Sequence, residues 1–453
     1  MKQADIVVVG GSAAGLTAAI TARRHYPGKS ILLVRQEKQV PIPCGIPYVF
    51  GTVGTPDKNL IPDTPLEKNN VELLLAEATD IDREAKVLKT DADHVQYDRL
   101  ILATGSRPVV PPIPGCDKDG VYTVLKDVNE LARLQNQVKT AQDIVIVGGG
   151  FIGIEFADEI KKSGDKNVTV VEVLDHCLGL AYDPEFCEEM GKIVESRGVK
   201  LMTSTKVESI EGAEAVQSVK ISGDQALKAD LVLLSIGAAA NVDLAKKTGL
   251  RIGLTGGIAV DRTMKSSDEN IFACGDCAEK ISFFGGGVSP LKLASIATHE
   301  ARIAGANLFG IRRENCGTVG VWATAVGDFA IGTAGLTETL ASRKGYRTVT
   351  ASIEGPNRHP GCMPGASNVK VKLVFEAHSG VLLGGQVSGS PVIGELTNAV
   401  SACVQRRMTA EEIAMFQIGT HPALTASPIA YALVNAAEMA IGQMKKDQLN
   451  PNA

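Results

Sequence analysis

The chain of 453 residues has few aromatic side chains, no long apolar run and no strong excess of charge of either sign. Aromatic residues make up 4% of the sequence, and the formal net charge is −5. This charge gives no reason to expect nucleic acid or an anionic membrane as a partner. No apolar run reaches the roughly 18 to 20 residues that a spanning helix needs. Because residues 1–6 lead straight into a strand pattern, we expect no signal peptide and predict a cytoplasmic protein.

The nine cysteines follow neither a disulfide framework nor the ligand spacing of a zinc site. Cys274 and Cys277 have the separation of a metal-binding pair, but no second pair completes a zinc site. We therefore predict no bound metal. In a cytoplasmic α/β enzyme most cysteines are reduced and buried, which leaves one or two for catalysis.

Glycine is abundant, with 47 residues, and it is concentrated in two informative turns, residues 10–15 and 148–153. Each turn follows a short apolar strand pattern and opens a helical pattern. In this setting glycines let the backbone approach a pyrophosphate, and the free N–H groups of the helix face its charge. Two such turns predict a flavin dinucleotide on the first and a nicotinamide dinucleotide on the second. The candidate residues are Gly10, Ser12, Ala13, Ala14 and Gly15, and Gly148, Gly150, Phe151, Ile152 and Gly153.

Acidic residues beyond each turn are candidates for binding ribose hydroxyls. Glu172 lies about 20 residues beyond the second turn, where a carboxylate accepts from a free 2′-hydroxyl and repels a 2′-phosphate. This favours NADH and leaves NADPH open. Beyond the first turn the candidate is Glu37, with Arg35 as the alternative residue, stacking on adenine.

Cys44 follows the first turn and precedes a predicted helix start at residues 45–48. A helix dipole at that place favours the thiolate. The positions that would complete a C-x-x-x-x-C pair hold Gln39 and Val49, so an internal disulfide of that spacing is excluded. A lone thiol can cycle as a mixed disulfide, a persulfide or a sulfenic acid.

Strand and helix patterns alternate through the first 310 residues, whereas strands followed by helices occupy the rest. The strands are predicted at residues 319–325, 347–353, 369–375 and 382–387. This order predicts an α/β protein with two Rossmann-like domains and a C-terminal α+β domain.

Six motifs in order carry a family resemblance: residues 10–15, 44–48, 103–108, 148–155, 274–276 and 421–422. Over nearly its whole length the chain resembles the FAD-dependent pyridine nucleotide–disulfide oxidoreductases. It is most similar to their single-cysteine branch, which contains coenzyme A–disulfide reductases, NADH oxidases and peroxidases, and NAD(P)H sulfur or persulfide reductases.

The resemblance implies a homodimer with a shared active site and specific domain limits. We expect an FAD-binding domain of residues 1–116 and 247–322, an NAD(P)H-binding domain of residues 117–246 and an interface domain of residues 323–453. It implies further cofactor contacts, with Asp276 on the flavin ribityl chain and Glu155 near nicotinamide and flavin. The other implied contacts are Pro43, Ala103, Thr104, Gly105 and Gly237.

The resemblance also implies a reaction. Electrons from NADH would pass through FAD to Cys44, which reduces a small disulfide, persulfide, polysulfide or coenzyme A derivative. His421 of the partner subunit would protonate the departing thiolate, although Ala426 stands where related enzymes place an orienting glutamate. The alternative is an NADH oxidase or peroxidase that reduces oxygen or peroxide through a Cys44 sulfenic acid. The run 40–44 lacks the serine of the coenzyme A–disulfide reductase pattern, so the acceptor stays open.

Overall fold

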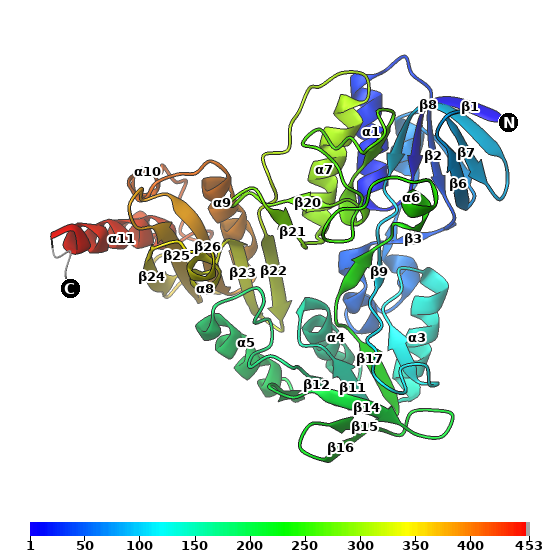
Figure 1. Ribbon diagram of the computed structural model, residues 1–453. Helices are drawn as coiled ribbons and strands as arrows, with labels where there is room; N and C mark the ends of the chain where they lie inside the picture. Colours follow the sequence, from blue (N-terminus) through cyan, green and yellow to red (C-terminus); the bar gives the residue numbers. More distant parts are fainter. Residues whose placement is uncertain (450–453) are drawn as a thin grey trace.

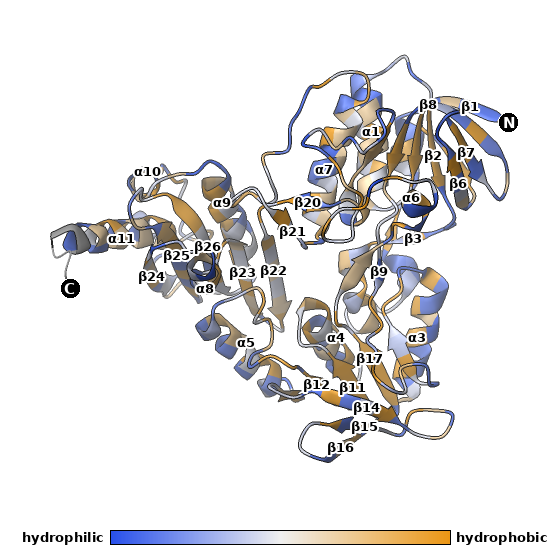
Figure 2. Cartoon of the chain, in the orientation of Figure 1, coloured by the Kyte–Doolittle hydropathy of each residue, from blue (hydrophilic) through white to orange (hydrophobic). Residues whose placement is uncertain are grey.

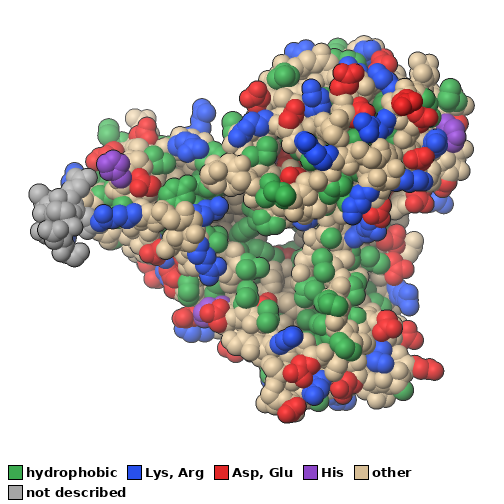
Figure 3. Space-filling model, in the orientation of Figure 1, with side chains coloured by type: hydrophobic (Ala, Val, Ile, Leu, Met, Phe, Trp, Pro, Cys, Tyr) green, Lys and Arg blue, Asp and Glu red, His purple; other side chains and the backbone are tan. Residues whose placement is uncertain are grey.

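The computed structural model describes residues 1–449, which form three lobes around a central hollow (Figures 1 and 3). The first lobe holds the N-terminus, the second contains β11 to β17, and the third contains β22 to β26 and the last helices. Apolar residues follow the buried strands, while the outer faces of α3 and α5 are more hydrophilic (Figure 2). Within residues 1–449 no helix is long and apolar enough to cross a membrane.

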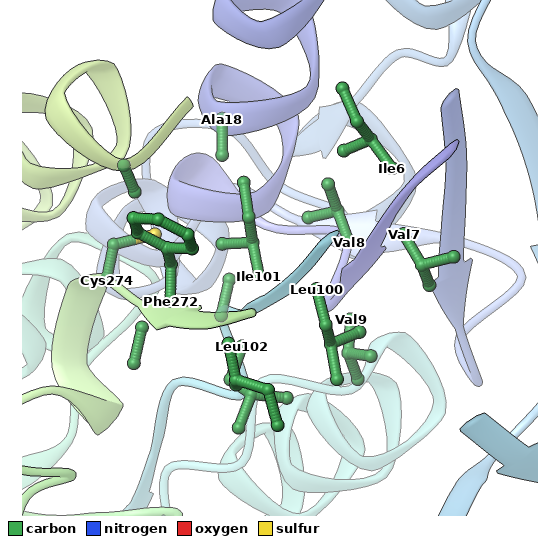
Figure 4. Packing of buried hydrophobic residues seen from close by; sticks show 14 of the residues in the cluster. Ile6, Val7, Val8, Val9, Ala18, Leu100, Ile101, Leu102, Phe272 and Cys274 are labelled. Carbon is green, nitrogen blue, oxygen red and sulfur yellow. The ribbon is translucent and has the colours of Figure 1, made fainter. Parts of the chain in front are cut away.

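The first lobe contains a seven-stranded sheet with a parallel core. Its strands, in spatial order, are β5 (Glu72–Leu75), β2 (Ile31–Arg35), β1 (Lys2–Val9), β8 (His94–Leu102), β7 (Val87–Thr90) and β6 (Ala78–Asp82), and β19 (Ile271–Ala273) pairs with β8. Helices α1 (Ala13–His25) and α7 (Ala294–Asn307) pack side by side. Aliphatic side chains of β1 and β8 fill the core together with Phe272 (Figure 4).

The second lobe contains a five-stranded parallel sheet and a small meander. The sheet order is β10 (Val121–Thr123), β17 (Leu231–Leu234), β11 (Asp143–Val147), β12 (Asn167–Val171) and β13 (Val199–Met202). The helices are α3 (Val128–Thr140), α4 (Phe151–Lys162) and α5 (Pro184–Ser196). The meander consists of β14 (Val207–Glu211), β15 (Ser218–Ile221) and β16 (Gln225–Lys228).

The third lobe contains a five-stranded antiparallel sheet covered by helices. The sheet order is β22 (Val321–Val326), β23 (Phe329–Gly335), β26 (Leu382–Gly389), β25 (Asn368–Glu376) and β24 (Thr348–Pro356). The helices are α8 (Glu338–Arg343), α9 (Ile393–Gln405), α10 (Ala410–Ala414) and α11 (Ala432–Leu449). The sequence patterns missed β23, because its small residues and glycines have low strand propensity and only its pairing with two neighbours makes it a strand.

Short elements lie between the main strands and helices. These are β3 (Val40–Pro41), β4 (Leu60–Ile61), β9 (Ser106–Pro108), β18 (Ala238–Ala240), β20 (Lys280–Ile281), β21 (Val288–Ser289), α2 (Thr64–Lys68), α6 (Asp243–Lys247) and the 3-10 turns η1 (Pro43–Gly45), η2 (Pro47–Phe50), η3 (Pro56–Lys58), η4 (Gly275–Cys277) and η5 (Pro428–Ala430). Since β19 and α7 pack into the first lobe, that lobe is built from two separate stretches of chain. The domain limits at residues 116, 247 and 322 stay a prediction.

Both glycine turns bring a helix very close to its strand. A Cβ atom at Gly15 would lie 1.9 Å from the Gly10 carbonyl oxygen, and one at Gly153 would lie 1.9 Å from that of Gly148. The last glycine of each turn therefore serves helix–strand packing rather than contact with a ligand.

We predict that Gly153→Ala destabilises the protein by about 1 to 3 kcal/mol, the usual cost of overpacking. The added methyl would also lie 2.8 Å from Ser235 Oγ. Thermal unfolding measures the effect, and Gly28→Ala is the control, because no atom lies within 4 Å of that site. Equal melting temperatures for the two variants would contradict the packing role.

Candidate functional site

One cavity of about 1530 Å³ extends past both glycine turns and past Cys44. Of the predicted cofactor-binding residues only Gly15 and Gly153 do not line it, and of the two predicted catalytic residues only Cys44 does. The predicted lining residues are Gly10, Ser12, Ala13, Ala14, Arg35, Glu37, Pro43, Ala103, Thr104, Gly105, Gly148, Gly150, Phe151, Ile152, Glu155, Glu172, Gly237 and Asp276. The fold thus places both predicted dinucleotide sites and the thiol in one continuous space.

The helix starts at this cavity fit the phosphate groups of dinucleotides. The N-cap residues, Ser12 of α1 and Gly150 of α4, make no side-chain capping bond, and neither first turn contains an acidic residue. Gly150 has no atom within 4 Å of its Cβ position, so the space before it is open. Free N–H groups and an uncompensated helix dipole suit an anionic ligand.

Glu172 supports the second turn directly. Its side chain is 8% exposed, and its two oxygens accept from the N–H groups of Gly149 at 2.6 Å and Leu174 at 2.9 Å. A carboxylate has about four acceptor sites, so bonds to a ribose hydroxyl remain available. That role stays a prediction.

Arg35 lines the first dinucleotide site, but its guanidinium is already paired. It donates to both oxygens of Asp63, at 2.6 and 2.8 Å, and to the Glu37 carbonyl oxygen at 2.8 Å. Its side chain also fills the space beside Gly11, where a Cβ atom would lie 2.3 Å from Arg35 Cδ. Stacking of Arg35 on adenine and a ribose bond to Glu37 both stay predictions. Asp63 was not predicted from the sequence, because it lies 28 residues beyond Arg35 in the chain.

Asp276 lies in η4, directly after β19, and lines the cavity. Its Oδ2 accepts from Ser106 Oγ at 2.7 Å and lies 3.5 Å from Lys126 Nζ. Lys126 belongs to the stretch between β10 and α3 and was missed by the sequence analysis, because no local motif marks it. This stretch brings a positive charge to the cavity.

The expectation that Cys44 has a lowered pKa is wrong. Cys44 is exposed to the cavity, but it lies in a 3-10 turn of three residues, too short to supply a helix dipole. Burial of the thiol by the surrounding walls raises its pKa, and the charge of Glu155 raises it further, whereas Lys126 lowers it. The surroundings of Cys44 therefore favour the thiol over the thiolate.

Glu155 is a titratable group that lines the cavity. Burial raises its pKa to about 7, although Thr324 Oγ1 donates to Oε1 at 2.8 Å. The same charge contributes to the raised pKa of Tyr48, about 12, for which burial is the larger cause. Near pH 7 Glu155 can accept or release a proton beside the thiol.

His421 lies away from the cavity within one protomer. It is exposed in the stretch between α10 and η5, and its Nδ1 accepts from the Ala423 N–H at 3.2 Å. The third lobe carries this stretch away from the first lobe (Figure 1). Its action on Cys44 would require a second subunit and stays a prediction.

Comparison with known proteins decides the family. Residues 4–301 match the family model described as pyridine nucleotide-disulphide oxidoreductase, and residues 321–430 match the dimerisation domain of these enzymes. The chain belongs to this family. Its members are FAD-dependent oxidoreductases that use a pyridine nucleotide, which confirms the predicted family, fold class and cofactors.

Relatives of this pyridine nucleotide-disulphide oxidoreductase include reductases and oxidases. An NAD(P)H coenzyme A polysulfide/persulfide reductase of Pyrococcus horikoshii is 33% identical, over 87% of this chain and 90% of the relative. An NADH oxidase of Methanocaldococcus jannaschii is 32% identical, over 90% and 92%. The solved NAD-dependent persulfide reductase from A. fulgidus is 31% identical with a TM-score of 0.90, covering 98% of this chain and 84% of the other.

We predict that Glu155→Gln stabilises the FAD-loaded oxidoreductase at pH 8.5 but not at pH 4. The raised pKa means that the folded state binds this proton more tightly than the unfolded state, so stability falls as pH rises from 4.5 to 7. At about 1.4 kcal/mol per pKa unit the penalty reaches about 3 kcal/mol. Unfolding midpoints across this range test it, with the exposed Glu67→Gln as control. A pH-independent difference would contradict the assignment.

Proposed function

We propose that this oxidoreductase uses NADH to reduce the sulfur–sulfur bond of a small disulfide, persulfide or polysulfide at Cys44. The observation that supports this proposal is one cavity lined by Cys44 and by both dinucleotide turns. The names of the persulfide and polysulfide reductases among its relatives support the acceptor class. A cytoplasmic location, which keeps Cys44 reduced, is part of the proposal.

The chemistry begins at the Cys44 sulfur. Its thiolate attacks one sulfur of the acceptor, a mixed disulfide or persulfide forms on Cys44, and the other fragment leaves as a thiolate that takes a proton. When bound, FAD supplies a two-electron relay from the nicotinamide to a sulfur–sulfur bond. Two electrons and a proton then release the bound sulfur and restore Cys44.

Charged residues around the cavity support these steps. Lys126 is the cation that favours the Cys44 thiolate, and it opposes the burial that raises the thiol pKa. Glu155, with a pKa of about 7, is placed to accept the proton that the thiol gives up. Glu172 and the bare N-terminus of α4 would bind the nicotinamide dinucleotide, with NADH preferred.

A homodimer with a shared active site completes the proposal. The family's dimerisation domain spans residues 321–430, which include His421. Exposed large apolar side chains lie within eight residues of His421 along the chain, with Met415 81%, Leu424 67% and Ile429 87% exposed. Exposed apolar side chains of this kind are suited to burial against a second copy, which would bring His421 to the partner's Cys44.

We predict that Cys44→Ser abolishes anaerobic NADH oxidation with polysulfide, because no other thiol lines the cavity described within residues 1–449. Stopped-flow absorbance of NADH measures the rate, and Cys362→Ser, which removes an exposed thiol outside the cavity, is the control. Polysulfide turnover that survives in Cys44→Ser would contradict the proposal. Activity confined to oxygen would instead assign the protein to the NADH oxidases.

We predict that a heterodimer of one Cys44→Ser subunit and one His421→Ala subunit keeps about half of the wild-type activity. If His421 acts across the interface, one of the two sites retains both residues. Tandem affinity tags isolate the heterodimer, and each homodimeric variant is assayed beside it. Activity no higher than that of the His421→Ala homodimer would show that His421 does not act in trans.

A further inference from the structure

The segment that carries Cys44 is packed on the second lobe, although the chain enters it from the first. Ile46, Val49 and Phe50 belong to the buried apolar cluster of the second lobe. The ring of Phe50 lies 4.8 Å from that of Phe156 in α4, measured between centroids. The residues that follow Cys44 thus pack on α4, the helix that begins at the second glycine turn.

Two buried polar side chains of the second lobe bind the backbone of this segment. Glu159 of α4, 1% exposed, accepts from the Thr52 N–H at 2.7 Å and from Thr52 Oγ1 at 3.0 Å. Gln135 of α3 donates to the carbonyl oxygens of Val49 at 2.9 Å and Gly54 at 2.8 Å. Since buried polar groups are costly to leave unpaired, these bonds fix residues 49–54 on the two helices.

The backbone at Gly51 lies very close to α4 at Glu159. A Cβ atom at Gly51 would lie 2.5 Å from the Glu159 carbonyl oxygen and 2.6 Å from its Oε2. The segment can therefore rest on α4 only with glycine at this position.

Helix α4 connects three parts of the site: the second dinucleotide turn, the cavity wall and the segment that carries Cys44. Gly150 begins it at the cavity, Glu155 faces the cavity, and Glu159 follows four residues later on the same side. Because a helix of this length is rigid, the position of Glu159 sets the distance between Cys44 and the second dinucleotide turn.

We infer that Glu159 is a positioning residue that holds Cys44 in the cavity through its bonds to Thr52. The inference rests on the proposed function, in which Cys44 is the reacting thiol. Loss of these bonds frees residues 51–54 from α4 and lets the thiol move away from the cavity that it lines. The charged and titratable groups that face Cys44 are Glu155 of α4, Lys126 from the stretch before α3 and Asp276 of η4.

The test is the rate at which iodoacetamide alkylates Cys44 in the FAD-loaded full-length protein, measured against pH. Peptide mass spectrometry separates Cys44 from the exposed Cys316, which serves as the internal reference. We expect Glu159→Gln to raise the Cys44 rate relative to Cys316 about fivefold at neutral pH and to lower its apparent pKa, since one pKa unit changes the thiolate fraction about tenfold.

Asp158→Asn is the matched control. Asp158 is also buried on α4 and shares the ammonium of Lys162 with Glu159, but its other partners are Arg197 and the Gly327 N–H, and none of its bonds reaches the Cys44 segment. Its Cys44 rate should equal that of the wild type.

Thr52→Ala and its rescue by Thr52→Ser provide a second test that does not change the buried helix face: Thr52→Ala removes the bond from Thr52 Oγ1 and keeps the bond from the Thr52 N–H, so we expect a smaller rise of the Cys44 rate than in Glu159→Gln. A Cys44 rate and pH profile unchanged in both Glu159→Gln and Thr52→Ala would overturn the inference; if Glu159→Gln fails to fold, Thr52→Ala decides. Alkylation needs no acceptor turnover, so this failure is distinct from failure of the proposed function, which Cys44→Ser reports.

Discussion

Helix α4 begins at the second dinucleotide turn and also binds the segment that carries Cys44, and the geometry of the site depends on this double constraint. Its first turn lacks a cap and an acidic residue, so the N–H groups there stay free for a phosphate. Its third turn carries Glu159, which binds the backbone beside Cys44. A shift of the helix would displace the dinucleotide turn and the thiol segment together.

The walls of the cavity also explain its electrostatics. Removal of water around Cys44 and Glu155 raises both pKa values, which favours the thiol form of Cys44 and brings the pKa of Glu155 to about 7. Thr324, which bonds to Glu155, comes from β22 of the third lobe. The Glu155 carboxyl group therefore belongs to the lobe that would bind NADH and accepts a hydrogen bond from the lobe that would form the dimer.

A buried polar network fixes the third lobe on the second. Asp183, at the start of α5, accepts from Lys372 Nζ at 3.0 Å and from Gln386 Nε2 at 2.6 Å, both in the third-lobe sheet. Loss of one partner would leave a buried charge uncompensated, which makes this contact hard to open. The stretch with His421 is thus carried on a firmly attached lobe, as a shared active site requires.

Local features could be predicted from the sequence, whereas features that depend on tertiary contacts could not. The glycine turns, Glu172 and Cys44 follow from short motifs, and the cavity collects almost all of them. Strand β23 was missed because its glycines pair only in the folded sheet. The predicted direction of the Cys44 pKa shift was wrong, because burial by residues far away in the sequence outweighs any effect of the short turn. Lys126 and Glu159 have no motif, since long-range packing brings them to the site.

The most direct measurement of Cys44 as the electron acceptor is a single turnover followed by mass spectrometry. FAD-loaded protein is treated with polysulfide under nitrogen, freed of excess reagent and mixed with one equivalent of NADH. We predict sulfur bound on the Cys44 peptide before NADH and its loss, with matching NADH oxidation, afterwards. NADH oxidation that leaves the sulfur on Cys44 would contradict the central claim.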